Sequence, residues 1–133
     1  ASIFTKIING EIPSYKVAVD QNFYAFLDFN PLAIGHTLVV PKKEVDYVFD
    51  LDDQTYAGLF AFVKKVSVAI KKSVECRRLG MIVYGLDVPH AHVHLIPVTG
   101  KGNELNFSNP KVELSQAAFM EIAQRIHAEF KNL

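Results

Sequence analysis

The 133-residue chain has no tryptophan and only one cysteine, Cys76, and its formal net charge at pH 7 is zero. A single thiol excludes an internal disulfide, which is typical of a reducing compartment. Because 14 basic residues are balanced by 14 acidic ones, the composition argues against a nucleic-acid-binding protein, which needs a basic patch. No apolar run approaches the roughly 20 residues of a membrane-spanning helix. We therefore expect a cytoplasmic protein with no membrane and no nucleic acid as partner.

The rest of the composition is that of a globular domain. Hydrophobic residues make up 50% of the chain and charged residues 21%, and a chain of this length can bury a substantial core. The sequence contains no internal repeat, low-complexity tract or linker. We expect a single domain over residues 1–133.

Apolar alternation and turn residues predict five β-strands. Gln21-Asn22 separates the first two strands, which resemble a hairpin, and Pro31 and Gly35 lie in the loop before the third. The expected strands cover residues 15–19, 23–28, 36–40, 80–85 and 91–98. Because the connections between strands are short, we expect an antiparallel sheet.

Helical spacing predicts one long central helix and one C-terminal helix. Asp52 is placed to cap the long helix, whose apolar face runs from Tyr56 to Val74, and Gly80 is expected to end it. Ser115 is placed to cap the last helix, and the buried stripe of that helix is expected to contain Phe119, Ile122, Ile126 and Phe130. The predicted fold class is α+β, with helices on one face of an antiparallel sheet of about five strands.

Three of the five histidines lie within five residues, at His90, His92 and His94. Side chains alternate between the two faces of a strand, so we expect all three imidazoles on one face. A neutral imidazole can act as a nucleophile, a base or a metal ligand, and an imidazolium can bind an anion. The row could also be purely structural, although three histidines in register make that interpretation the weakest.

A zinc site is the first alternative for this row. The outer two Cα atoms of three alternating strand residues are about 13 Å apart, whereas zinc–nitrogen bonds are about 2.0–2.1 Å long. One ion is therefore not easily shared by all three histidines, although His36 offers a further ligand. We predict no metal and keep a zinc-binding protein as an alternative.

Nucleophilic catalysis on phosphorus is the second interpretation. A free histidine has a pKa of about 6.5, so most of it is neutral at pH 7. One ring nitrogen can attack phosphorus when the other holds its proton against a fixed acceptor. A second histidine, two residues further along, presents a hydrogen-bond donor on the same face, where it can stabilise the developing charge.

The residues also carry a resemblance to a known family. His90–Ile96 has the order His, apolar, His, apolar, His, apolar, apolar, and it is accompanied by Ile7–Pro13, Phe26–Phe29 and Gly35–Lys42. Together these segments resemble the histidine-triad (HIT) family over residues 2 to 98. The most similar branch is that of the Hint-type and Fhit-type hydrolases of nucleoside phosphoramidates and dinucleoside polyphosphates. The resemblance implies a HIT-like fold and a purine nucleotide substrate, with no cofactor required.

The resemblance also implies roles for single positions. His92 matches the nucleophile that takes the nucleoside monophosphate, and His94 matches the residue that contacts the phosphate. His90 matches the histidine that orients the nucleophile, and His36 completes the network. Asp28 matches the acidic residue that binds the ribose hydroxyls. The positions that match the purine pocket of the family are Ile3, Phe4, Ile7, Phe26 and Phe29.

The chain departs from the family pattern before His90. The stretch Tyr84–Pro89 lacks the usual asparagine, and Asp87 occupies the place of a hydroxyl or amide side chain. A carboxylate that faces a phosphate is repulsive unless it is protonated or turned away. The second alternative function is therefore a nucleotide-binding sensor or scaffold with weak or no catalysis.

Residues 99–133, a loop and the C-terminal helix, match nothing in the family pattern. The family also implies a homodimer whose sheet continues across the interface.

Overall fold

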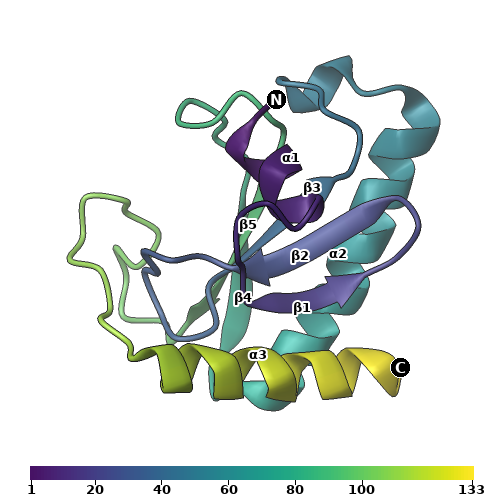
Figure 1. Ribbon diagram of the computed structural model, residues 1–133. Helices are drawn as coiled ribbons and strands as arrows, with labels where there is room; N and C mark the ends of the chain where they lie inside the picture. Colours follow the sequence, from purple (N-terminus) through teal and green to yellow (C-terminus); the bar gives the residue numbers. More distant parts are fainter.

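The computed structural model describes all of residues 1–133 and contains a five-stranded antiparallel sheet with the strand order β1-β2-β3-β5-β4 (Figure 1). The strands are β1 (Lys16–Val19), β2 (Phe23–Leu27), β3 (Thr37–Pro41), β4 (Arg78–Ile82) and β5 (Val93–Val98). The predicted α+β class and the antiparallel pairing are confirmed. None of the helices combines the length and the apolar character that a membrane span requires.

Helices lie on both faces of this sheet rather than on one. They are α1 (Ile3–Ile8), the short 3-10 helix η1 (Val48–Asp50), α2 (Asp53–Ser73) and α3 (Gln116–Lys131). The main core lies between the sheet and the helices α2 and α3. A smaller core lies under α1 on the opposite face, where Phe4 and Ile7 pack against Phe26 and Leu38. Figure 1 shows α1 in front of the sheet and α2 behind it. The prediction of helices on one face was therefore wrong for α1.

Side-chain caps start all three α-helices. Asp52 and Ser115 accept hydrogen bonds from the backbone N–H groups of Thr55 and Ala118, as their positions predicted. Ser2 accepts one from Thr5 N–H and starts α1. Each such cap contributes about 1 kcal/mol, because it satisfies an N–H group that has no partner inside the helix.

The predicted end of the long helix was wrong. Helix α2 ends at Ser73, and Gly80 lies inside β4. The requirement for glycine there is close packing, because a Cβ at position 80 would lie 2.8 Å from Leu105 Cδ1. Leu105 belongs to the loop between β5 and α3, so Gly80 lets this loop approach the sheet.

Gly35 provides a test of the turn that leads into β3. Its φ is +91°, and a Cβ there would lie 2.9 Å from Val74 Cγ2. The backbone conformation and the overpacking should together make Gly35→Ala lower the free energy of unfolding by about 2–4 kcal/mol in urea titrations. Gly10→Ala is the matched control, because φ is +80° and nothing lies within 4 Å. It should lose only about 1–2 kcal/mol, and equal losses at both positions would show that the contact with Val74 has no effect.

Candidate active site

Four histidines converge on the face of the sheet that carries α1. His94 lies in β5, whereas His90 and His92 precede the strand, so β5 begins later than predicted. The alternation nevertheless holds, since the intervening Ala91 and Val93 belong to the main core behind the sheet. The centroids of the His92 and His94 rings are 5.1 Å apart. His36 directly precedes β3, and Leu38, two residues further along, pairs with His94. All four histidines are buried.

The ring of His90 is held in one tautomer by two hydrogen bonds. Its Nε2 lies 2.8 Å from the carbonyl oxygen of Pro41, to which it donates a proton. Its Nδ1 then accepts a hydrogen bond from Ser2 Oγ, 2.7 Å away. Burial lowers the pKa of His90, so the ring is neutral at pH 7.

A carboxylate at the surface extends this network. Glu44 Oε1 accepts hydrogen bonds from the backbone N–H of Ser2 at 2.8 Å and from Thr5 Oγ1 at 2.6 Å. These bonds, that of Ser2 first, lower the pKa of Glu44 to about 2. The start of α1 is therefore attached to the loop after β3, which keeps Ser2 against His90.

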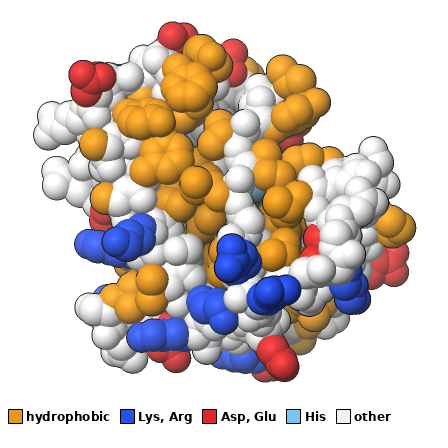
Figure 2. All heavy atoms as spheres, turned by 180° about the vertical axis from the view of Figure 1, so that it is seen from behind, with side chains coloured by type: hydrophobic (Ala, Val, Ile, Leu, Met, Phe, Trp, Pro, Cys, Tyr) orange, Lys and Arg blue, Asp and Glu red, His pale blue; other side chains and the backbone are white.

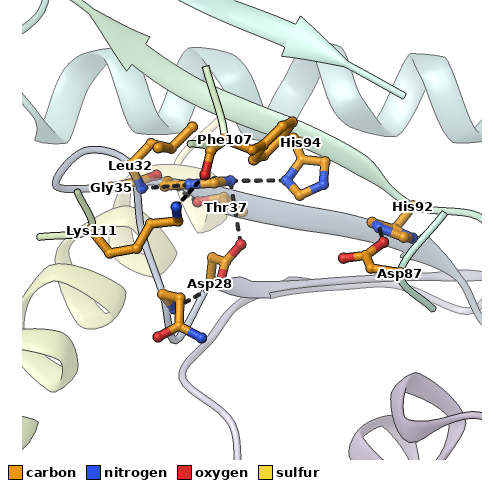
Figure 3. A network of polar contacts seen from close by, with 11 residues as sticks. Asp28, Leu32, Gly35, Thr37, Asp87, His92, His94, Phe107 and Lys111 are labelled. Atoms are coloured by element: carbon orange, nitrogen blue, oxygen red, sulfur yellow. Dashed lines mark hydrogen bonds and ion pairs between the residues drawn. The ribbon is translucent and has the colours of Figure 1, made fainter. Parts of the chain in front are cut away.

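His92 presents a free lone pair. Its Nδ1 lies 2.7 Å from the carbonyl oxygen of His90 and donates to it, so in the neutral ring the lone pair is on Nε2. This Nε2 is buried and has no hydrogen-bond partner. Oδ1 of Asp87 lies 3.2 Å away, close but not aligned for a hydrogen bond. The Asp87 side chain is 65% exposed and lies beside the His92 ring (Figure 3).

His36 and His94 form a directed hydrogen-bond chain (Figure 3). The backbone N–H of Leu32 donates to His36 Nδ1 at 3.0 Å, so the proton of His36 is on Nε2. That proton is donated to His94 Nδ1, 2.9 Å away, and Asp28 Oδ2 lies 3.5 Å from the same Nε2. The proton of His94 must then be on its Nε2. Burial, followed by the charge of neighbouring histidines, lowers the pKa of His36 to about 3 and that of His94 to about 4.

The two middle rings are therefore chemically complementary. His92 offers an unprotonated nitrogen, and His94 offers an N–H donor from the adjacent ring on the same face. A nucleophile next to a preorganised donor is the arrangement needed to attack phosphorus and to stabilise the charge on its oxygens.

A metal site is the other chemistry that these groups suggest. The ligand atoms of Asp28, His36 and His94 lie within 4.8 Å of one another. A histidine that binds a metal through one nitrogen normally donates a proton from the other. His36 does the opposite, because its Nδ1 accepts from Leu32 and its Nε2 carries the proton. The cluster fits a hydrogen-bond chain better than a metal site.

The five residues predicted to line a purine pocket do not form one group. The ring of Phe4 packs edge-on against His92 and His90, with centroid distances of 5.0 and 5.8 Å. Phe26 and Ile7 are buried behind Phe4 and support it. Ile3 and Phe29 are about half exposed, and Phe29 packs against Tyr15.

Two residues near the site were missed by sequence reasoning, because they lie in the unmatched loop between β5 and α3. The centroid of the Phe107 ring lies 4.9 Å from that of the His94 ring and 6.1 Å from that of the Tyr84 ring. Lys111 donates to the carbonyl oxygen of Phe107. Burial raises the pKa of Asp28, and the charge of Lys111 opposes this rise, whereas for His36 the charge of Lys111 adds to the lowering of the pKa by burial and by His94. No local motif marks these residues, since long-range packing such as that of Leu105 on Gly80 brings the loop to the sheet.

A cavity of about 340 Å³ is lined in part by Ala91 and His92. Its walls are formed by residues 46–49 and 83–86, and Tyr47, Phe49 and Tyr84 are its aromatic members. These aromatic side chains are more than half exposed. The nucleophile candidate is thus next to an open apolar space.

Comparisons with known proteins agree with this geometry. The model of the HIT domain matches residues 9–101. An uncharacterized HIT-like protein of Borreliella burgdorferi is 39% identical, with 90% of this chain and 97% of that protein covered. The adenosine 5'-monophosphoramidase hnt1 of Schizosaccharomyces pombe is 32% identical, with coverages of 97% and 98%. The crystal structure of a hypothetical histidine triad nucleotide-binding protein from Sulfolobus tokodaii matches with a TM-score of 0.87 and 33% identity, covering 98% of this chain and 92% of that one.

The fold and the histidine row together define a histidine-triad protein. The chain belongs to the HIT family. These matches support a nucleotide-binding hydrolase as the type of protein.

The neutral state of His36 and His94 has a measurable consequence. The pKa of His36, about 3, and that of His94, about 4, lie below the ordinary 6.5. Below pH 6.5 the unfolded chain therefore binds protons that the folded protein does not. Stability is therefore lost as the pH falls from about 6.5 towards 4. We expect the urea midpoint to be lower at pH 5 than at pH 7, a window in which most carboxylates stay ionised.

His36→Asn isolates one of these groups. Its amide oxygen can replace Nδ1 as the acceptor for the N–H of Leu32, but the side chain does not titrate. The variant should lose less stability between pH 7 and pH 5 than the parent, whatever its stability at pH 7. Parallel pH profiles of the two proteins in urea titrations would contradict this assignment.

Proposed function

We propose that the protein transfers the nucleoside monophosphate of a nucleoside phosphoramidate or a dinucleoside polyphosphate to His92 and then to water. The observation that carries this proposal is the fixed tautomer of His92, whose Nδ1 donates to the carbonyl oxygen of His90 and leaves Nε2 free. The names of relatives such as the S. pombe monophosphoramidase support the same chemistry.

Each histidine has a distinct part in this reaction. His92 Nε2 attacks the α-phosphorus while the bond from phosphorus to the amine or phosphate leaving group breaks and the leaving group takes its electron pair. The N–H of His94 donates to the phosphate oxygens as negative charge develops there. His36 holds His94 in the donating tautomer. His90 holds His92 through its carbonyl oxygen. The bond from phosphorus to His92 then breaks when water attacks.

Asp28 and Phe4 would hold the nucleoside. Oδ1 of Asp28 already accepts the backbone N–H of Asn30, at 2.8 Å, which leaves Oδ2 to accept from ribose hydroxyls. Burial is the main cause that raises the pKa of Asp28, and two hydroxyl donors would offset part of this loss of hydration. Phe4 lies against the reacting histidine, and the base would pack beside it with the exposed Ile3 and Phe29, while the buried Ile7 and Phe26 support Phe4.

Replacing the nucleophile tests the proposal directly. With adenosine 5'-phosphoramidate as substrate, His92→Ala should lower AMP release on the order of 10⁴-fold or more, because the covalent route is lost. His127→Ala is the matched control, since His127 lies on α3 and bonds to the carbonyl oxygen of Val17, outside the cluster. Activity that survives in His92→Ala would exclude His92 as the nucleophile. Tight AMP binding without turnover in the parent would favour the sensor or scaffold.

A homodimer is the proposed assembly. Strand β4 pairs only with β5, so its outer edge is free to continue the sheet in a second copy. Figure 2 shows hydrophobic side chains gathered on the face behind the view of Figure 1. Exposed large apolar residues near this edge and the start of α2 include Tyr47, Phe49, Tyr56, Met81 and Val83. A patch of this kind is typical of a protein interface.

The two methionines give a matched test of the dimer. Met81 in β4 is 54% exposed and Met120 in α3 is 46% exposed. In size-exclusion chromatography with light scattering, we expect the parent and Met120→Asp to have the mass of a dimer and Met81→Asp that of a monomer. A monomeric parent would exclude the proposed assembly.

A further inference from the structure

The loop between β5 and α3 brings one aromatic side chain to the histidine row. The ring of Phe107 is half-buried, and its centroid lies 4.9 Å from that of the His94 ring, with the two planes inclined at 59°. The other rings beside His94 are those of His36 and His92, with centroids at 5.2 and 5.1 Å. Phe107 therefore supplies the one apolar ring that packs against His94.

The ring of His94 needs a second support besides its hydrogen bond. That single bond runs from His36 Nε2 to His94 Nδ1, over 2.9 Å. One bond to one ring atom leaves the ring free to tilt, whereas the N–H on the opposite side must point at a phosphate oxygen, because hydrogen bonds weaken steeply as they bend. In Figure 3 Phe107 and His92 lie on opposite sides of the His94 ring, so packing by Phe107 limits this tilt.

The loop that carries Phe107 is anchored on both sides of it. The whole connection from the end of β5 to the start of α3 contains no helix or strand. Ordered loops longer than about 12–15 residues are uncommon in compact domains and usually have a function. Before Phe107, the side chain of Leu105 packs on Gly80 of β4. After it, the backbone N–H of Val112 donates to the carbonyl oxygen of Pro31 at 2.8 Å. Phe107 is thus held against the sheet by contacts that do not involve the histidines.

Phe107 also belongs to the packing that separates His94 from water. His94 is only 5% exposed. Burial is the main cause that lowers its pKa to about 4, the charge of His92 adds to this effect, and the charge of Asp87 opposes it. Only a neutral His94 can accept the proton of His36 at Nδ1. The apolar cover therefore favours the same tautomer that this hydrogen bond selects.

We propose that Phe107 is a positioning residue for the transfer reaction, which acts by holding the Nε2–H group of His94 towards the phosphate. This inference rests on the proposed function and adds a residue from outside residues 9–101, to which the family match is confined. Without the ring of Phe107, His94 keeps its bond from His36 but can tilt, and water reaches it. The transition state then loses a directed donor, while the nucleoside would still be held by Asp28.

Two substitutions separate the ring of Phe107 from the rest of the loop. Phe107→Ala removes the ring, and Phe107→Tyr keeps it. With adenosine 5'-phosphoramidate, kcat of Phe107→Ala should fall about 10–100-fold, because a misplacement of about 1 Å at a reacting group can cost that much. KM should change less than about threefold, since the lost interaction belongs to the transition state. Phe107→Tyr should keep the kcat of the parent.

Phe130→Ala is the matched control for loss of a half-buried phenylalanine. The ring of Phe130 packs on that of Phe62 at 5.5 Å, against the main core. This variant should have a lower urea midpoint than the parent and the same kcat, because the main core lies on the other face of the sheet from the histidine row. A fall of kcat equal to that of Phe107→Ala would show that general destabilisation causes both losses.

Titration of the histidine rings by NMR gives a readout that needs no turnover. In Phe107→Ala the pKa of His94 should rise from about 4 towards the ordinary value of about 6.5, because water reaches the ring. It should stay at the value of the parent in Phe107→Tyr and Phe130→Ala. The signal of His94 is identified by its absence in His94→Asn.

The outcomes distinguish this role from the proposed function. An unchanged kcat in Phe107→Ala, a loss in KM alone, or a His94 pKa that stays at the value of the parent would each overturn the inference and leave the proposed function intact. Equal losses of kcat in Phe107→Ala and Phe107→Tyr would overturn it as well, because the ring would then not be the group that matters. Absence of turnover in the parent would overturn the proposed function and this role together.

Discussion

The hydrogen bond from His92 Nδ1 to the carbonyl oxygen of His90 decides which nitrogen of the central imidazole is free. That bond depends in turn on the position of His90, whose own ring is held between the carbonyl oxygen of Pro41 and the hydroxyl of Ser2. The site is therefore built on a series of single donors and acceptors with fixed directions. Moving the proton of His92 from Nδ1 to Nε2 would occupy the nitrogen that has to react and leave the carbonyl oxygen of His90 without this donor.

Burial makes this arrangement work at neutral pH. A charged imidazole loses hydration inside the protein, so both His36 and His94 are kept neutral there, with pKa values of about 3 and about 4. A neutral ring has one donor and one acceptor. The N–H of Leu32 therefore fixes the tautomer of His36, and His36 in turn fixes the tautomer of His94. Two protonated rings would offer only donors. The packing that buries these rings, such as that of Phe107 against His94, therefore contributes to the chemistry as well as to stability.

Much of the fold could be predicted from local patterns. The hairpin, the capping roles of Asp52 and Ser115 and the alternation around His92 all follow from the periods of strands and helices. Helix α1 was missed because six residues are too few for a helical period to be visible. The end of α2 was placed too late because no glycine or proline marks Ser73, and Gly80 serves a packing contact that only the folded loop reveals.

The residues of the candidate site were likewise predicted only in part. His36 and Asp28 were assigned by resemblance, and the structure brings both to His94, whereas Phe107 reaches that ring from a loop with no motif. For Asp87 the sequence indicated a conflict, a carboxylate opposite a phosphate. In the structure Oδ1 of this carboxylate lies 3.2 Å from Nε2 of His92. Because the Asp87 side chain is 65% exposed, it can turn away from the site, which is one of the two ways in which a carboxylate avoids repelling a phosphate.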